Sequence, residues 1–325
     1  MGLRRRRFIG MVAGAALAGA VPRAARAADA PRTLRVLCIR TDGIKSLLYA
    51  QKANLFARRG LSVDVVALGS SGAILPALLG GSAEIGAANL FPVFAAYARN
   101  VALRMIAPAS LYTSDHADSL LLVRKDSPLQ AARDLNGKTI GVDSLSDVYT
   151  IATRAWVDQG GGDGATLRPV EIPPTEQLSA LDAGRVDASV FKTPYATVAL
   201  ESGTVRVLGK PLDAIAPRFL LSCWVATTDF IANNPQLVSG YVATMGEAAR
   251  YTNAHQSETV DMMAQFTGAD PALMRRAVRS TTAVSATLDE LQRPLDFAYK
   301  YGLIPQRFDS SAVLAPGFPL TGTST

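Results

Sequence analysis

The stretches LPALLGGSAE at residues 75–84 and LSALDAGRVD at residues 178–187 show the same pattern, 103 residues apart. In each, a helical run ends at a glycine, and an acidic residue then opens a segment of small residues. Glycine often ends a helix because it tolerates left-handed backbone angles, so each stretch predicts a helix, a turn and a strand. The repeat favours two duplicated lobes over the alternative of two unrelated units that share common turn chemistry.

The sequence around both stretches extends the repeat. Residues 85–88 and 188–191 are predicted strands, and each is followed by a loop with a proline and then by another helix. Residues 137–142 predict the first strand of the second copy, which corresponds to residues 33–39 in the first copy. Strands that alternate with helices predict an α/β fold in which each lobe is a mixed sheet flanked by helices.

Local patterns complete the first lobe and the C-terminal tail. Helices are predicted over residues 44–58 and 73–79, with a strand over residues 61–68 between them. The tail begins with a predicted strand over residues 219–227 and continues with helical patterns in residues 234–299. Prolines are favoured in the first turn of a helix, so helix starts are predicted near three of them: Pro235, Pro271 and Pro294.

The tail is too long to belong to the second lobe, so we expect it to return to the first. The chain would then cross between lobes twice, near residues 120–123 and near residues 221–225. The predicted domains are a first lobe made of residues 28–121 and 224–325, and a second lobe made of residues 122–223.

Residues 1–27 have the pattern of an export signal. An arginine cluster precedes a weakly apolar stretch over residues 8–21, and Ala25-Arg26-Ala27 supplies the small residues of a cleavage site, so cleavage is expected after Ala27. The run Arg5-Arg6-Arg7-Phe8-Ile9 fits the twin-arginine route. The apolar stretch is short for a membrane span, and Ala20 stands where a lipoprotein signal would place cysteine. We therefore expect a periplasmic product without a lipid anchor.

The charge of the chain predicts no nucleic-acid or membrane partner. The formal net charge is +6, but six of the 33 Lys and Arg residues lie in residues 1–27, where no acid occurs. Their removal leaves 27 basic residues against 27 acidic ones. The two cysteines, Cys38 and Cys223, are either buried thiols or one disulfide. No Cys-x-x-Cys pair and no phosphate-binding loop occur in the sequence, so we expect neither a metal nor a cofactor.

Two facing α/β lobes should bind a ligand at the carboxyl ends of their strands, where the helix N-termini also lie. The predicted ligand-binding residues stand in the loops at these ends and on the return strand: Thr41, Asp42, Gly43, Ser70, Ser71, Asn89, Ser144, Ser146, Lys192 and Trp224. In the repeat, Asn89 and Lys192 occupy the same position.

Several of these side chains have a structural alternative. Each serine is either an anion donor or a helix cap, and Asp42, Asp143 and Asp147 are either general acids, part of a cation site, or helix caps. Lys192 is either a solvated loop charge or a counter-charge in the cleft. Trp224 either forms the floor of the pocket or fills the core.

The ordered set of motifs resembles a known family. The motifs are LLYAQKANLF at residues 47–56, LLGG at residues 78–81, DLNGKT at residues 134–139 and GRVDA at residues 184–188. Together they resemble the periplasmic substrate-binding proteins of ABC importers for nitrate, sulfonates and taurine, whose superfamily includes binders and makers of the thiamine pyrimidine precursor. The resemblance implies a type II two-lobed fold that closes on its ligand about two hinge crossings.

The resemblance also implies a function. We expect a monomer that captures a small molecule, such as a sulfonate or nitrate, and delivers it to an inner-membrane ABC permease with its ATPase. Ser70, Ser71 and Lys192 suit an anion, whereas Asp42 and Asp143 suit an amine, a zwitterion or a hydroxyl-rich ligand. The alternative is a secreted enzyme of the same fold that acts on a small heterocyclic or carboxylic substrate with Asp42 or Asp143 as the base. The cysteine-rich motif of the pyrimidine synthases is absent, which favours a binding protein without catalytic residues.

Overall fold

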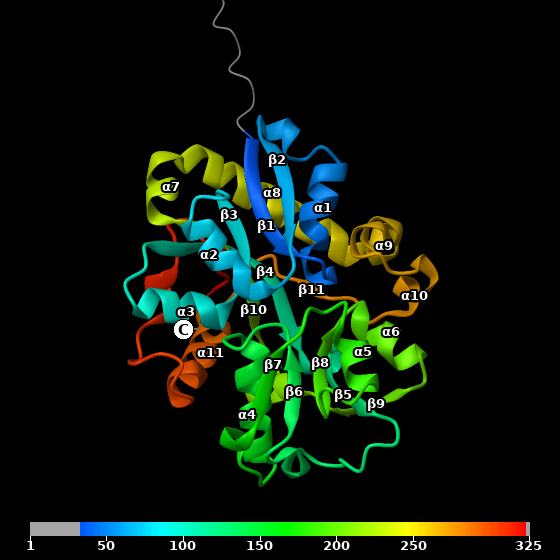
Figure 1. The fold of residues 1–325 in the computed structure, drawn as a ribbon. Coiled ribbons are helices and arrows are strands. Elements are labelled where there is room, and N and C mark those ends of the chain that lie inside the picture. The colour runs from blue at the N-terminus through cyan, green and yellow to red at the C-terminus, as the bar shows by residue number, and fades with distance from the viewer. Residues whose placement is uncertain (1–32, 323–325) are drawn as a thin grey trace, which may run out of the picture. The chain divides into compact units, whose positions relative to one another are not determined.

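Two β-sheets organise the chain, and helices flank each of them (Figure 1). The computed structural model describes residues 33–322, so the predicted export signal at residues 1–27 lies outside the described residues. Within the described range, no helix has both the length and the apolarity that a membrane span requires.

The first lobe is built on a six-stranded sheet with the order β11-β4-β10-β3-β1-β2. Its strands are β1 (Thr33–Ile39), β2 (Ser62–Leu68), β3 (Ile85–Asn89), β4 (Leu103–Thr113), β10 (Arg218–Thr227) and β11 (Thr281–Thr282). Its helices are α1 (Lys45–Lys52), α2 (Ile74–Leu79), α3 (Leu90–Ala98), α7 (Thr228–Asn233), α8 (Pro235–Ala254), α9 (Val260–Thr267), α10 (Pro271–Arg276) and α11 (Leu288–Lys300). The tail therefore returns to the first lobe, as the sequence predicts.

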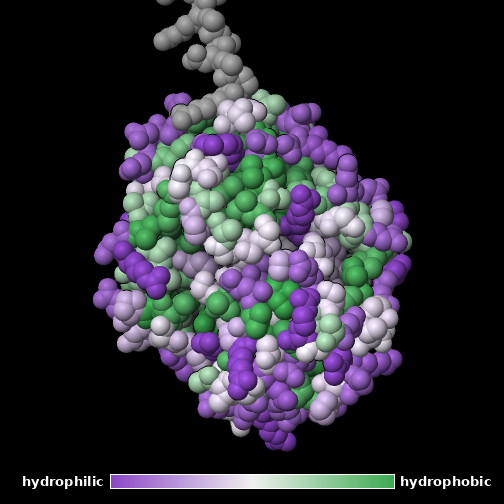
Figure 2. Space-filling model, viewed as in Figure 1, coloured by the Kyte–Doolittle hydropathy of each residue, from purple (hydrophilic) through white to green (hydrophobic). Residues whose placement is uncertain are grey.

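The second lobe is built on a five-stranded sheet with the order β7-β6-β8-β5-β9. Its strands are β5 (Ser119–Arg124), β6 (Thr139–Val142), β7 (Arg168–Glu171), β8 (Ala188–Lys192) and β9 (Val205–Gly209). Its helices are α4 (Val148–Gln159), α5 (Gln177–Asp182) and α6 (Tyr195–Glu201). In Figure 2, hydrophilic residues cover most of this lobe's visible face, whereas hydrophobic residues gather over the middle of the first lobe.

The two sheets confirm the duplication. In each, three parallel strands are followed by an antiparallel fourth, since β10 runs antiparallel to β3 in the first sheet and β5 runs antiparallel to β8 in the second. The register also matches, because Val36 pairs with Ile85 and Ile140 pairs with Ala188. Ile85 and Ala188 are the residues that the 103-residue repeat aligns, so the repeat predicts the strand pairing correctly.

The crossings between the lobes lie elsewhere than predicted. The first sheet connects to the second at residues 114–118, between β4 and β5, and the return runs through residues 210–217, between β9 and β10. The predicted boundaries after residues 121 and 223 thus fall inside β5 and β10. The apolar runs around them pair within a sheet. The real crossings are joined to each other by two hydrogen bonds: Ser114 N donates to Pro217 O at 2.9 Å, and Lys210 Nζ donates to Ser114 O at 2.9 Å.

Two predicted helix limits are also wrong. The helix expected over residues 44–58 is α1 alone, because Asn54 adopts a left-handed φ of 55° two residues after the helix ends. Pro294 lies inside α11 and not near its start. That helix begins at a capping box in which Thr287 Oγ1 accepts from Glu290 N at 3.1 Å and Glu290 Oε2 accepts from Thr287 N at 2.9 Å. Pro235 and Pro271 do begin helices, as predicted.

The two cysteines are free, buried thiols. Cys38 on β1 belongs to the apolar core on one face of the first sheet, and Cys223 on β10 belongs to the core on the other face. Strand β3 lies between the two strands that carry them. Burial raises the pKa of Cys38 to about 12 and raises that of Cys223 as well, so both remain protonated.

Candidate ligand-binding site

A cavity of about 50 Å³ lies between the two lobes, and its wall includes both polar and apolar side chains. One water-sized group needs roughly 10–15 Å³, so the cavity holds a few such groups. The polar residues of its wall come from three places: Thr41, Ser71, Asn89, Ser110, Ser222 and Ser280 from the first lobe, Tyr149, Lys192 and Thr193 from the second, and Asp118 from the crossing between them. The wall also includes four apolar residues: Ile39, Ile44, Ala87 and Leu221.

Five of the ten predicted residues line this cavity, namely Thr41, Gly43, Ser71, Asn89 and Lys192. Asn89 and Lys192 are the last residues of β3 and β8, the positions that the repeat aligns. The carboxyl ends of two equivalent strands therefore meet at one cavity, as expected for paired α/β lobes.

Two of the wall residues carry unused hydrogen-bonding groups. Asn89 Nδ2 and Ser71 Oγ are buried, and neither has a hydrogen-bond partner among the described residues. A buried donor without a partner costs free energy, so such groups are rare unless something else satisfies them. Both are able to donate to an oxygen placed in the cavity.

Lys192 is a counter-charge in the cleft and not a solvated loop charge, since it is only 8% exposed. Its Nζ donates to Asp143 Oδ2 at 3.0 Å and lies 4.6 Å from the centre of the Tyr149 ring. Burial raises the pKa of Asp143, but the Lys192 charge and hydrogen bonds from Ser71 and Lys192 outweigh burial and hold the pKa below its usual value. Lys192 thus has donors left for a ligand while its charge is partly balanced.

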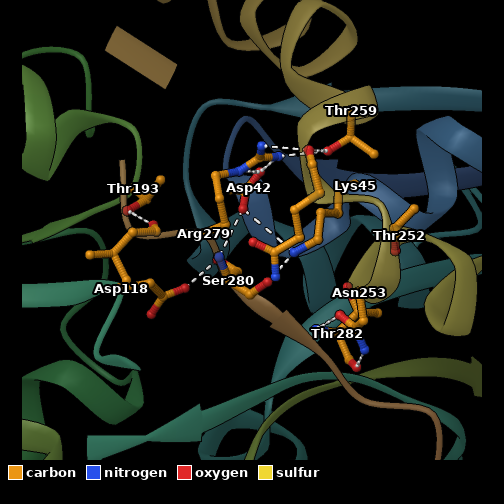
Figure 3. Close-up of polar contacts among 12 residues, drawn as sticks. Asp42, Lys45, Asp118, Thr193, Thr252, Asn253, Thr259, Arg279, Ser280 and Thr282 are labelled. Atoms are coloured by element: carbon orange, nitrogen blue, oxygen red, sulfur yellow. Dashed lines mark hydrogen bonds and ion pairs between the residues drawn. The ribbon is translucent and has the colours of Figure 1, made fainter. Parts of the chain in front are cut away.

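Asp42 is part of a buried ion cluster beside the cavity and does not line it (Figure 3). Its Oδ1 accepts from Arg279 Nε at 3.0 Å and from Arg279 Nη2 at 2.6 Å, and its Oδ2 accepts from Ser280 N at 2.8 Å. Lys45 Nζ lies 3.6 Å from Asp42 Oδ2. Burial raises the pKa of Asp42, but these cations outweigh it and the pKa is lowered. The sequence predicts direct contact between Asp42 and the ligand. In the structure the Asp42 carboxylate instead binds Arg279 and Ser280 and so supports the cavity wall.

The other predicted residues lie around the cavity. Trp224 fills the core, where its ring lies 5.7 Å from that of Tyr241, so it does not form the pocket floor. Ser70 lies half-buried at the start of the turn before α2, and Ser146 is exposed. Ser144 is buried against the other lobe, because a Cβ added at Gly72 would lie 2.9 Å from its Oγ.

Asp147 is a helix cap, one of the alternatives that the sequence leaves open. Its Oδ1 accepts from Tyr149 N at 3.0 Å and from Thr150 N at 3.2 Å at the start of α4. Burial, with a smaller contribution from the Asp143 charge, raises the pKa of Asp147 to about 7. In the described part of the chain, no group of three or more His, Cys, Asp or Glu side chains is placed to hold a metal ion.

Sequence reasoning missed Asp118, Tyr149 and Ser280. Ser119 pairs with Lys192 in the second sheet, just as Ser222 pairs with Asn89 in the first. Asp118 directly precedes Ser119, so a correct placement of the crossings would have identified Asp118 as a cavity residue. Ser280 reaches the cavity from a segment more than 160 residues further along the chain than Asp118, and no local pattern marks it.

Direct contacts join the lobes around the cavity. Asp42 N donates to Thr193 O at 3.3 Å, and Ser71 N donates to Asp143 Oδ2 at 3.3 Å. Nearer the surface, Arg276 Nη2 of α10 pairs with Glu201 Oε2 of α6 at 2.7 Å. The cavity walls are therefore held together by bonds that only the approach of the two lobes can form.

A larger groove of about 630 Å³ also occurs, but it belongs to the first lobe alone. Its walls come from α1, β2 and α9 and include Leu48, Val65 and Phe266. Movement of the lobes relative to each other would not enclose a ligand there, so the interlobe cavity is the better candidate site.

Two duplicated α/β lobes with a cavity between them define a protein of the periplasmic-binding-protein fold. The chain belongs to the NMT1/THI5 like family, whose model matches residues 43–259. A relative from Escherichia coli strain K12, provisionally named as an aliphatic sulfonates-binding protein, is 25% identical over 242 residues, which are 73% of this chain and 74% of the relative.

Solved structures share the fold. The alkanesulfonate-binding protein SsuA from Xanthomonas axonopodis pv. citri, bound to MOPS, is 20% identical with a TM-score of 0.73 over 88% of this chain and 98% of its own. The desulfurization enzyme DSZB is 16% identical with a TM-score of 0.62 over 87% of this chain and 96% of its own. The fold thus occurs in a binding protein and in an enzyme, and the site has to distinguish the two.

Proposed function

We propose that the chain is the solute-binding component of an ABC importer and captures a small molecule that carries an anionic group, such as a sulfonate. The observation that supports this most is the set of unused donors in the cavity wall. Asn89 Nδ2, Ser71 Oγ and the remaining protons of Lys192 come from both lobes and meet in one cavity. Hydrogen bonds from neutral and charged donors are how proteins hold such oxyanions.

The ligand is bound by closure of the lobes about residues 114–118 and 210–217. The closed form then docks on an inner-membrane permease driven by its ATPase. The protein acts as a monomer in the periplasm after cleavage behind Ala27, without a lipid anchor. The relative named for aliphatic sulfonates supports the ligand class. A micromolar dissociation constant, about −8 kcal/mol, suits capture from dilute solution.

A second pocket gives room for the organic part of the ligand. It has a volume of about 230 Å³, shares Ile39 with the cavity and is lined from both lobes. Its wall includes Leu68 of the first lobe and Pro173 and Tyr195 of the second. The organic part of a ligand would leave the cavity past Ile39 and lie against these side chains and Arg40, so an organic anion fits better than a bare inorganic one.

Thermal unfolding of residues 28–325 with a panel of compounds tests the proposal. The panel contains alkanesulfonates, nitrate, aromatic acids, amines and pyrimidines. A ligand at 100 times its dissociation constant stabilises the protein by about 2.7 kcal/mol, which raises the melting temperature measurably. If no compound of the panel changes the melting temperature, the proposal is wrong.

Asn89→Leu sharpens the test because it removes the unused amide and keeps the number of side-chain heavy atoms. Loss of a hydrogen bond to a charged group costs about 1.5–3 kcal/mol, so affinity for a sulfonate should fall roughly ten- to hundredfold. Asn233→Leu changes an exposed asparagine of the same lobe and is the matched control, with unchanged affinity expected. Mass spectrometry of the recovered ligand separates binding from the enzymatic alternative, because a binding protein returns the ligand intact.

A further inference from the structure

The groove of about 630 Å³ on the first lobe has the volume and the wall of a ligand site. Proteins usually hold small organic molecules in concave sites of about 300–1,000 Å³, with mainly apolar walls and a few polar groups. Helices α1 and α9 and strand β2, which lie on the same side of the lobe in Figure 1, supply most of this wall. Its apolar residues are Leu48, Val65, Ala67, Met262 and Phe266, and its polar residues are Arg40, Gln51, Lys52 and Gln265.

The groove carries positive charge that no acid balances. Arg40 and Lys52 are both exposed, and neither forms an ion pair among the residues that the structure describes. Helix α1 contains no acid, and the Asp261 carboxylate of α9 pairs with Arg275 at 3.3 Å. Asp64 of β2 projects from the face of the sheet opposite to the groove, because successive side chains of a strand alternate. The groove should therefore attract an anion.

Arg40 is held beside the aromatic ring of the groove. Its Nη1 donates to Phe266 O at 3.1 Å, and its guanidinium carbon lies 5.5 Å from the centre of the Phe266 ring. The N–H groups on Nε and Nη2 have no hydrogen-bond partner in the described part of the chain. These two groups form the fork that binds both oxygens of a carboxylate. The position of Arg40 is thus fixed while its donors remain available to a ligand.

We propose that this groove is a second binding site and takes an organic anion with a flat apolar body, such as an aromatic carboxylate. The ring of the ligand lies against Phe266, Met262 and Val65, and its carboxylate binds Arg40 and Lys52. The site goes beyond the proposed function, because its walls come from the first lobe alone and binding there needs no lobe closure. The groove meets the second interlobe pocket at Arg40 and Ala67, so the test has to separate the two sites.

Two probes of the same shape isolate the charge of the ligand. 2-Naphthylacetate carries a carboxylate where 2-naphthylacetamide carries a neutral amide. Titration calorimetry with residues 28–325 at low ionic strength should give roughly tenfold tighter binding of the carboxylate, since each of two exposed ion pairs contributes up to about 1 kcal/mol.

Variants of exposed groove residues locate the site. Lys52→Gln removes one of the two cations and should reduce the preference for the carboxylate to roughly threefold. Gln265→Glu keeps the size of the side chain, adds a negative charge to the groove and should abolish the preference. Lys300→Gln changes an exposed lysine of α11 in the same lobe and is the matched control, with an unchanged preference expected.

Equal affinities for the two probes in the wild type, binding of neither, or an undiminished preference in Lys52→Gln would overturn the site. Asn89→Leu separates the groove from the interlobe cavity. If this variant weakens 2-naphthylacetate as much as it weakens a sulfonate, the compound occupies the cavity and the proposal is wrong. A dimer in sedimentation velocity that does not bind the compound would place a second copy of the chain in the groove and overturn the proposal as well. The proposed function is decided separately, by the sulfonates of the thermal panel.

Discussion

The buried cluster around Asp42 makes the sharpest stability prediction. Asp42→Asn keeps the size of the side chain and removes its charge. Lys45, with no exposed surface, and Arg279, 9% exposed, would then lack the counter-charge that binds them at 3.6 Å and 2.6 Å. Breaking a buried ion pair by removing one partner typically costs about 3–5 kcal/mol, because the remaining charge stays desolvated. We expect a loss of unfolding free energy in that range at neutral pH.

Urea unfolding followed by circular dichroism measures this loss. The matched control is Asp289→Asn, which breaks the pair between Asp289 and Arg293 one helical turn apart on the surface of α11. Exposed pairs of this kind contribute about 0.3–0.5 kcal/mol, so the control should change stability little. A loss below about 1 kcal/mol for Asp42→Asn, or one equal to that of the control, would show that the buried cluster does not depend on the Asp42 charge.

The same variant has a predicted pH dependence. The folded protein lowers the pKa of Asp42, so the stabilisation is fully present above the unfolded value of about 3.9 and is lost as the pH falls through the folded value. The difference in stability between wild type and Asp42→Asn should therefore be constant near neutral pH and shrink below about pH 4. A difference that grows on acidification would contradict this assignment.

Two further predictions concern lobe contact and titration. Gly72→Ala places a methyl group 2.9 Å from Ser144 Oγ, so it should keep the lobes apart and weaken ligand binding about tenfold. The double variant Gly72→Ala/Ser144→Ala should recover part of the affinity. An unchanged affinity of Gly72→Ala in titration calorimetry would contradict the prediction. The folded pKa of Asp147, about 7, lies above the unfolded value of about 3.9, so the folded state retains a proton between these values. The unfolding free energy of the wild type should consequently fall between about pH 4 and pH 7 relative to that of Asp147→Asn. If urea unfolding gives both proteins the same dependence of unfolding free energy on pH, the raised pKa of Asp147 is excluded.

Local sequence patterns predicted the elements of the fold well where a repeat or a turn residue marked them. The alignment of Asn89 with Lys192 follows from helices that end at glycine and strands that begin after an acid, and both signals depend on neighbouring residues. The same reasoning placed the crossings wrongly. Apolar runs such as residues 120–123 look alike whether they pair within one sheet or pass between two, because hydrophobicity alone does not identify the partner strand.

The site was predictable only in part, for a related reason. Loops after strands locate the cavity, but a charge in such a loop contacts the ligand only if no partner neutralises it. Of the two cations paired with Asp42, Lys45 is close in the sequence, but Arg279 lies more than 200 residues further along the chain, so no local pattern reveals the complete cluster. Asp118 shows the opposite situation. In the sequence it does not differ from other loop acids, and only the described structure shows that it has no cationic partner within ion-pair distance.

Both lobes should close on one small ligand, and hydrogen–deuterium exchange can follow this closure in each lobe separately. Residues 28–325 are compared with and without a saturating sulfonate chosen from the thermal panel. Segments around Thr41 and Ser71 in the first lobe and around Tyr149 and Lys192 in the second should be protected simultaneously, because each contributes to the same cavity. Protection confined to one lobe, or centred on the groove beside Phe266, would contradict it.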